Sequence, residues 1–329
     1  MICVSYTDAN TGRITRIPKE LINENSDFSN KWVQLISPDD REVSFIASKT
    51  GIQIDFLKAA LDEEERPRID KEDDTLLILV DIPTVVSDPK KTYSTYSTIP
   101  MAIIMKEDYF ITVCLEDTPI LQEFIQGMSR MRGINLNMKS RTTFQLLFQV
   151  ATKYLYYLRQ IDKSSQRIQS ELHRTMKNKE LIELLDIENS LVYFSTSLRS
   201  NAAIIEKLTR TSLLKKHEED QDLIEDVAIE NGQAIEMCTI YRDILSRTMD
   251  AYSSVISNNM NSIMKVLTSI TLIISIPTCI AGLFGMNLDG IPGNSSYAGK
   301  WPWAFAIVSG ISIVISVIVA IFMKKKKMM

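Results

Sequence analysis

Two uncharged segments near the carboxyl end limit most strongly what this chain can fold into. Val266–Phe284 and Ala304–Met323 contain no charged side chain. As helices rising 1.5 Å per residue, each is about 28–30 Å long, which matches the thickness of a bilayer core. The sequence contains no third segment of this kind. It therefore excludes an ordinary soluble enzyme and a transporter with many membrane helices.

Lysines flanking these segments predict the membrane topology. Lys265 precedes the first span, Lys324–Lys327 follows the second, and the connection Asn287–Trp303 contains only Lys300. The positive-inside rule then places both termini in the cytoplasm, as expected for a multi-pass protein of the cell (inner) membrane. The first residues contain no apolar core of a signal peptide, so no secretory signal is expected.

Charge and cysteine content narrow the partners further. The formal net charge is −4, and Lys324–Lys327 contributes +4, so the rest of the chain carries −4 − 4 = −8. This acidic balance argues against a nucleic-acid partner, which requires a basic face. No nucleophile–base pair, phosphate loop or metal cluster is visible, so neither an enzyme nor a bound cofactor is predicted. The cysteines lack the spacing of a zinc site or a disulfide framework: Cys3, Cys114, Cys238 and Cys279.

The first part of the chain reads as a mixed α/β cytoplasmic domain over residues 1–138. An acidic stretch at residues 62–70 predicts a solvated loop. The elements expected there are short strands or helices at Lys31–Leu35 and Val43–Ala47, a short helix containing Asp55, a buried strand at Thr75–Asp81, and a hairpin joining Met101–Met105 to Tyr109–Leu115.

Residues 139–260 read as a helical stalk. One helical face recurs at Leu146, Val150, Tyr154, Leu158 and Ile161. A second helix is expected over Lys179–Arg210, and a third opens near Glu218. Because the third meets no proline before the membrane, it should continue into the first span for about 100 Å, with Gly232 as its weak point. The fold class is therefore an α+β membrane protein, with a pore domain over residues 261–329 and spans at about 266–284 and 304–323.

A polar stripe runs along the first span at helical spacing. Its members step by three or four and fall within an arc of about 100°: Asn261, Met264, Thr268, Thr271, Ser275, Thr278 and Gly282. From the residues alone, two interpretations stay open. The stripe either packs against another helix through small side chains or lines a pore, which requires an oligomer. Since it contains no carboxylate, a pore of this kind suits a hydrated or partly hydrated cation.

Acidic residues recur on one face where the third helix begins. Asp222, Asp226 and Glu230 step by four. One interpretation is a low-affinity regulatory site for a divalent metal at a subunit interface. The other is a solvated helix start, where acids complement the helix dipole.

The first span ends in Gly285-Met286-Asn287. With the approach NNMNSIMKVLT, the exit IPTCIAGLFGMN and the KKKK tail, this tripeptide resembles the signature of the CorA family of divalent-cation (magnesium/cobalt) transporters. The resemblance implies a homopentameric funnel whose first spans line the pore. It implies a selectivity filter at Gly285, Met286 and Asn287, where Asn287 meets the metal through hydrating water. It further implies a polar constriction at Thr278, a hydrophobic gate at Leu267 and Met264, and an inner end at Asn261.

This chain departs from the family pattern at several positions. Ser275 replaces a larger apolar residue, and Pro277 is displaced by one position. The loop Leu288–Gly293 lacks the Met-Pro-Glu of magnesium members and resembles the zinc-transporting ZntB branch. The expected function is uptake of Mg²⁺, with Co²⁺ or Ni²⁺ as further cargo. The alternatives are a Zn²⁺ transporter of the ZntB type or, in another class, a membrane-anchored coiled-coil sensor or scaffold.

Overall fold

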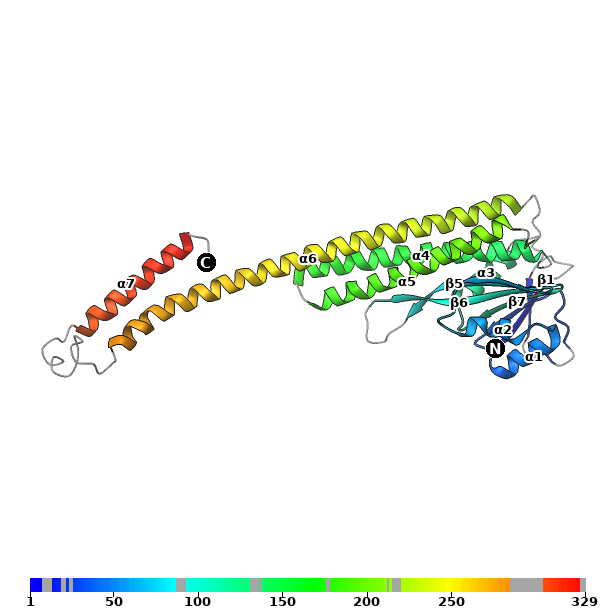
Figure 1. Cartoon of the computed structure of the whole chain (residues 1–329), viewed down its shortest axis with the longest axis horizontal. Coiled ribbons are helices and arrows are strands. Elements are labelled where there is room, and N and C mark those ends of the chain that lie inside the picture. Colours follow the sequence, from blue (N-terminus) through cyan, green and yellow to red (C-terminus); the bar gives the residue numbers. More distant parts are fainter. Residues whose placement is uncertain are drawn as a thin grey trace. The chain divides into compact units, whose positions relative to one another are not determined.

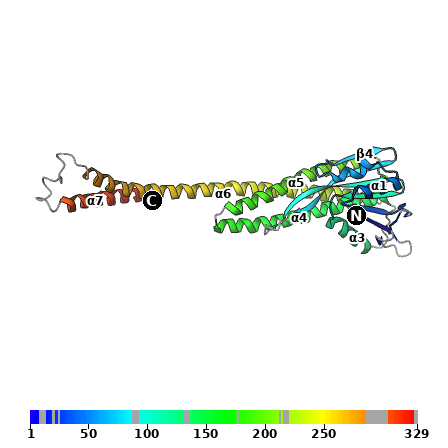
Figure 2. The ribbon, with the colours of Figure 1, turned by 90° about the horizontal axis from the view of Figure 1, so that it is seen from below.

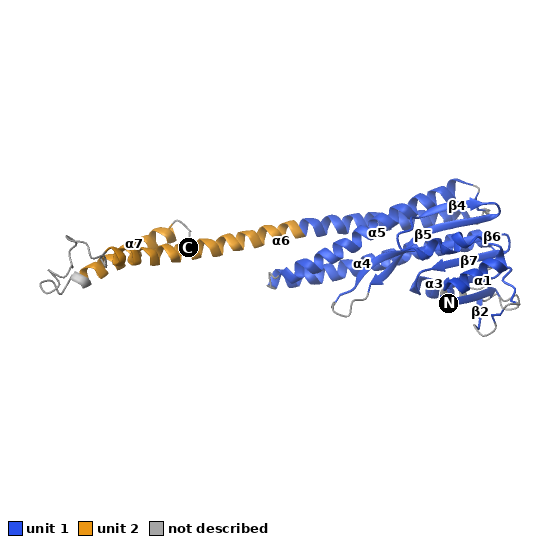
Figure 3. Ribbon diagram, turned by 60° about the horizontal axis from the view of Figure 1, so that its bottom comes forward, with its two compact units in different colours: residues 1–248 blue, residues 249–329 orange. Residues whose placement is uncertain are grey.

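The structure is a computed structural model that divides into two compact units, Met1–Thr248 and Met249–Met329 (Figure 3). Helix α6 (Gln221–Phe284) contributes residues to both units. The predicted division into residues 1–138, 139–260 and 261–329 stays a prediction. The structure describes residues 1–7, 14–18, 22–23, 26–86, 93–130, 136, 138–175, 178–211, 213–214, 220–284 and 304–325.

A seven-stranded sheet forms the centre of the described part of the first unit (Figure 1). Its order is β2-β1-β3-β7-β6-β5-β4, and all neighbours are antiparallel except β3 and β7. The strands are β1 (Ile2–Thr7), β2 (Ile14–Ile17), β3 (Trp32–Ile36), β4 (Arg68–Glu72), β5 (Thr75–Val86), β6 (Thr95–Lys106) and β7 (Tyr109–Cys114).

Helices cover both faces of this sheet. On one face, α1 (Asp40–Thr50), α2 (Ile54–Lys58) and the 3₁₀ turn η2 (Ala59–Leu61) share a core with Leu77 and Leu79 of β5. On the other face lie α3 (Pro119–Arg130), α4 (Lys139–Thr175) and α5 (Asn178–Arg210), with α4 and α5 in contact with β5 and β6 (Figures 1 and 2). The prediction of a layered α/β domain is confirmed.

Local signals settle the two ambiguous segments of the sequence. Lys31–Leu35 overlaps β3, and Val43–Ala47 lies in α1, which begins with a capping box between Asp39 and Glu42. The predicted hairpin is confirmed as β6–β7. The prediction of a loop at residues 62–70 is wrong at its end, because Arg68–Asp70 pairs with β5 as part of the edge strand β4.

The helical predictions hold closely. All five members of the predicted α4 face are buried, and α6 is one continuous helix through both Gly232 and Pro277. Within the first unit, α6 presents a seam with heptad spacing. Its members are buried or half-buried: Ile224, Val227, Asn231, Ala234, Cys238, Tyr241 and Leu245.

Two polar members fix the register of this seam against α5. Asn231 donates from Nδ2 to the carbonyl oxygen of Leu198 (3.2 Å), and the Cys238 thiol donates to that of Leu191 (3.2 Å). Burial raises the pKa of Cys238 to about 11, so the side chain stays a neutral thiol at physiological pH.

Past the seam, α6 crosses a stretch with weak helix propensity. Residues 252–262 read YSSVISNNMNS, which is dominated by serine and asparagine. These residues favour caps and turns over helix interiors, because their side chains compete for backbone hydrogen bonds. Most of the stretch is exposed. Its helical state therefore receives little help from its own residues.

A long-range amide contact holds α5 against the sheet. Strand β4 begins at Arg68, opposite Leu79, so its pairing with β5 does not extend to the backbone of Asp81. Asn201 bonds to that backbone instead: its Oδ1 accepts from the Asp81 N–H (2.9 Å) and its Nδ2 donates to the Asp81 carbonyl (2.7 Å).

Asn201→Ala should therefore lower the free energy of unfolding by about 1–3 kcal/mol, because the part-buried N–H of Asp81 loses this acceptor and the Asp81 carbonyl keeps only the Tyr154 hydroxyl (3.2 Å) as a donor. Thermal or urea unfolding of the full chain in detergent measures this. The matched control is Asn189→Ala, which removes an exposed amide from the same helix. Equal stability of the two variants would contradict the assigned role.

Candidate ion-conduction site

Two helices of this chain are suited to a membrane by length and composition, among the described residues. They are Gln221–Leu283, whose apolar part lies at its carboxyl end, and Ile307–Lys325 in α7 (Ala304–Lys325). In the most apolar stretch of each helix, only 6% and 11% of the residues, respectively, are buried within the chain. Large side chains such as Ile274 and Ile313 are therefore exposed, which water penalises and lipid does not.

The predicted pore-lining residues lie together on the exposed side of α6. Met264, Leu267, Thr271, Ser275 and Thr278 are all exposed in the single chain, as are the remaining members of the polar stripe. Their exposure leaves the stripe available to other copies or to water.

The covered side of the same segment lies roughly opposite the stripe at 100° per residue. Ser269 is fully buried there, and Ile273, Pro277 and Ile280 are half-buried. The covered side of α7 carries a row of small residues at helical spacing: Ser309, Ser312, Ser316 and Ala320. Covering one side of α6 thus leaves the polar side open.

Hydroxyl groups of the stripe donate hydrogen bonds to backbone carbonyls of their own helix. Thr271 donates to the carbonyl of Leu267 (2.9 Å), Ser275 to that of Thr271 (2.7 Å), and Thr278 to that of Ile274 (2.9 Å). With its proton so engaged, each hydroxyl presents oxygen lone pairs outward. Such a surface can accept hydrogen bonds from the water shell of a cation.

The predicted selectivity filter at Gly285, Met286 and Asn287 lies outside the described residues, as do the loop Leu288–Gly293 and the aromatic residues Trp301 and Trp303. The described part of α6 ends at Phe284, immediately before the tripeptide. The filter therefore rests on the sequence alone.

The predicted regulatory carboxylates lie at the start of α6. Asp222 and Asp226 are exposed, and Glu230 is half-buried. Among the described residues, no group of three or more His, Cys, Asp or Glu side chains comes close enough to hold a metal ion.

The burial of a carboxylate beside this face, Asp220, was not predicted. Asp220 is almost fully buried, and its Oδ1 lies 3.6 Å from Nε of Arg141 in α4. No local pattern indicates this burial, because the ion pair joins positions far apart in the chain. The pair ties the start of α6 to the start of α4.

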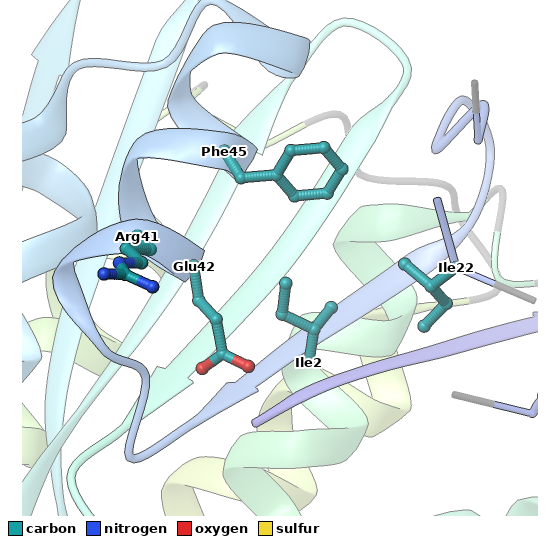
Figure 4. A pocket seen from close by; sticks show the side chains of 5 residues that line it. All are labelled: Ile2, Ile22, Arg41, Glu42 and Phe45. Carbon is teal, nitrogen blue, oxygen red and sulfur yellow. The ribbon is translucent and has the colours of Figure 1, made fainter. Parts of the chain in front are cut away.

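One pocket of the first unit is lined by residues remote from the stripe in sequence. It has a volume of about 280 Å³ and is lined by Ile2, Ile22, Arg41, Glu42 and Phe45 (Figure 4). The Glu42 carboxylate accepts from the Asp39 N–H (3.3 Å) as part of the α1 cap. This pocket thus contains structural groups of the helix cap.

Comparison with known proteins finds related sequences over most of this chain. Residues 28–325 match the family model described as CorA-like Mg2+ transporter protein. The cobalt/magnesium transport protein CorA of Methanocaldococcus jannaschii is 26% identical over 305 residues, which cover 90% of each chain.

Solved structures share the fold. The complete structure of the CorA magnesium transporter from Methanocaldococcus jannaschii matches with a TM-score of 0.77 at 24% identity, covering 98% of this chain and 97% of that one. The ZntB cytoplasmic domain from Vibrio parahaemolyticus matches with a TM-score of 0.58 at 11% identity, covering 78% of this chain and 98% of that one. Because the family model spans most of the sequence, this chain belongs to the CorA-like Mg²⁺ transporter family, whose members are membrane ion transporters and not enzymes.

Proposed function

We propose that this chain forms a homopentameric channel that carries hydrated Mg²⁺ across the cell (inner) membrane, with both termini in the cytoplasm. The observation that carries the proposal is the polar stripe on an otherwise apolar and exposed helix. Hydroxyl groups facing lipid are unfavourable, so the stripe should face other subunits or water. Five copies of the first span around one axis would meet this requirement.

Along such a pore, the cation would enter at the Asn287 ring and retain water. Below the ring it would pass Thr278, Ser275 and Thr271, whose outward lone pairs can bind the water shell. Met264 and Leu267 would close the pore by excluding water, and Asn261 would form the inner end. Gly282 and Thr268 complete the lining.

The choice of ion rests on family membership and on the chemistry of the stripe. Mg²⁺ loses its water reluctantly, which suits a pore without carboxylates. The filter loop, by contrast, resembles the zinc-transporting branch. Flux of Mg²⁺ and Zn²⁺ into vesicles containing the purified chain, with and without a pH gradient, tests the proposal. Mg²⁺ flux without a pH gradient supports a Mg²⁺ channel. If only Zn²⁺ flux is observed, and only with a pH gradient, the chain is a Zn²⁺ transporter instead.

Thiol accessibility tests which side of α6 lines the pore. In a Cys279-free chain the other three cysteines are buried. A cysteine replacing Thr271 or Ser275 should react with a small water-soluble thiol reagent in vesicles, because water reaches the stripe. A cysteine replacing Ile273, on the covered side, should react far more slowly. Equal labelling rates at the two sides would reduce the stripe to a packing surface.

A further inference from the structure

Buried polar side chains join the apolar interior of the first unit where α4 ends and α5 begins. Along most of their contact, α4 and α5 meet through apolar side chains such as Tyr154 and Phe194, whose ring centroids lie 5.0 Å apart. Near the hairpin end, buried Ser165, Glu180 and Glu183 accompany three buried apolar residues, Ile168, Leu172 and Leu184. We call this region the polar end of the helical bundle.

The register of the two helices brings these residues to similar levels. Ile161 of α4 and Ile187 of α5 line one common pocket. Because α4 and α5 are successive antiparallel helices, one further turn along α4 and one turn back along α5 lead to Ser165 and Glu183. The next turn leads to Gln169 and Glu180.

Several side chains that line the pocket carry oxygen atoms that can bind a cation or its water. Its volume is about 130 Å³, and α5 and α6 contribute mainly apolar walls through residues such as Ile187 and Leu245. Its polar side chains carry carboxylate, hydroxyl, amide or phenol oxygen, and none is cationic: Asp162, Ser165, Gln166, Gln169 and Tyr241. The neighbouring basic residues Arg159, Lys163 and Arg167 are exposed, and Arg159 lies close enough to interact electrostatically with the Tyr241 phenol.

Hydrogen bonds in the pocket engage the nitrogen ends of the amides. Gln166 donates from Nε2 to Oδ2 of Asp162 (2.9 Å), and Gln169 donates from Nε2 to Oγ of Ser165 (2.9 Å). Each bond occupies one of the two N–H groups of its amide. The carboxylate, amide and phenol oxygens of the pocket can accept hydrogen bonds from the water of a hydrated hard cation.

The two glutamates carry negative charge that the described residues compensate poorly. Glu180 is 8% exposed and Glu183 7%, and Oε2 of Glu180 has no hydrogen-bond partner among the described residues. Lys179 places Nζ 3.7 Å from Oε1 of Glu183, but its side chain is 74% exposed and its charge is solvated. The start of α5 favours an acid at Glu180 through its dipole. Burying two carboxylates still costs free energy without a counterion.

We propose that the polar end binds a hydrated divalent cation of the Mg²⁺ class within a single chain. Glu180 and Glu183 supply the charge, and the oxygen-lined pocket one turn away holds the water shell. Mg²⁺ commonly retains several waters and uses only one or two carboxylates, which matches this set. The site is separate from the acidic face at Asp222, Asp226 and Glu230. It requires neither the pore nor the pentamer.

The test compares stability with and without metal in the full chain purified in detergent. In chelator, E180Q/E183Q should unfold at the same temperature as the wild type or higher, because two buried charges have been removed. Added Mg²⁺ should raise the unfolding temperature of the wild type more than that of the variant. In chelator the variant would then be at least as stable as the wild type, and in Mg²⁺ it would be less stable. A contact with a purely structural role would not produce this reversal.

Direct binding of Mn²⁺, a paramagnetic substitute for Mg²⁺, provides the second measurement. The E180Q/E183Q variant should lose one Mn²⁺ site per chain or weaken it by about tenfold or more. The control E188Q/E206Q removes two other α5 carboxylates that are not buried, and should bind like the wild type. D222N/D226N/E230Q should likewise retain this site, which separates it from the acidic face.

Two results would overturn the proposal. One is unchanged Mn²⁺ binding in E180Q/E183Q, and the other is an equal loss of stability in chelator and in Mg²⁺. If the double variant does not fold, E180Q alone leaves the ion pair of Glu183 in place and provides the same comparisons. Unchanged Mn²⁺ binding in that variant, at wild-type affinity, would count equally against the site.

Discussion

Replacing Asn287 by alanine is expected to reduce selective Mg²⁺ flux to background while the protein still assembles. In the proposed pore, Asn287 is the residue whose amide oxygen meets the water shell of the entering cation. Alanine removes that acceptor from every subunit at once, so the whole ring is lost. Flux of Mg²⁺ and Zn²⁺ into vesicles measures the effect, with chain assembly checked by size-exclusion chromatography.

The matched control for this experiment is Asn259→Ala. It removes the same side-chain amide from the approach to the first span, and Asn259 lies on the side of α6 away from the polar stripe. This control should retain wild-type flux. Near-wild-type flux in folded Asn287→Ala would remove Asn287 from the selectivity filter.

Neutralising the acidic face should weaken inhibition by cytosolic Mg²⁺. In a pentamer, Asp222, Asp226 and Glu230 of neighbouring chains would repel one another, and a cation between them would stabilise the closed state. Metal can shift the equilibrium only by its differential affinity for the two states. With D222N/D226N/E230Q that difference falls, and the Mg²⁺ concentration for half-inhibition should rise by about tenfold or more.

A control with the same change in charge separates this effect from general electrostatics. Glu236, Asp243 and Asp250 are exposed acids on α6, about a quarter turn or more around the helix from the acidic face. E236Q/D243N/D250N should keep the wild-type concentration for half-inhibition. If D222N/D226N/E230Q behaves in the same way while still pentameric, the acidic face is a solvated helix start.

Periodicity predicted those parts of the molecule whose pattern is long. The buried face of α4 extends over several turns, and α6 is continuous from Gln221 to Phe284, so both were visible in the sequence. Short segments carry less information. Val43–Ala47 is compatible with a strand or a helix, and the deciding signal is the cap at Asp39 together with the turn at Gly51, whose φ is 61°.

Contacts between distant positions could not be predicted from a pattern. Asn201 meets the backbone of Asp81 across 120 positions, and Asp220 pairs with Arg141. Burial of Glu180 and Glu183 was also hidden, because acids near a helix start usually face solvent. In each case packing between elements, and not local preference, determines the environment of the side chain.

The serine- and asparagine-rich stretch of α6 has a consequence for assembly. An isolated helical segment of such composition is marginal in water, because nucleation is costly and each residue adds little. Residues 252–262 are mostly exposed in the single chain, so their helix depends on stabilisation from outside this stretch. Amide hydrogen exchange at these residues therefore reports subunit association: protected amides mark chains that have joined an oligomer, and rapidly exchanging amides mark chains that have not.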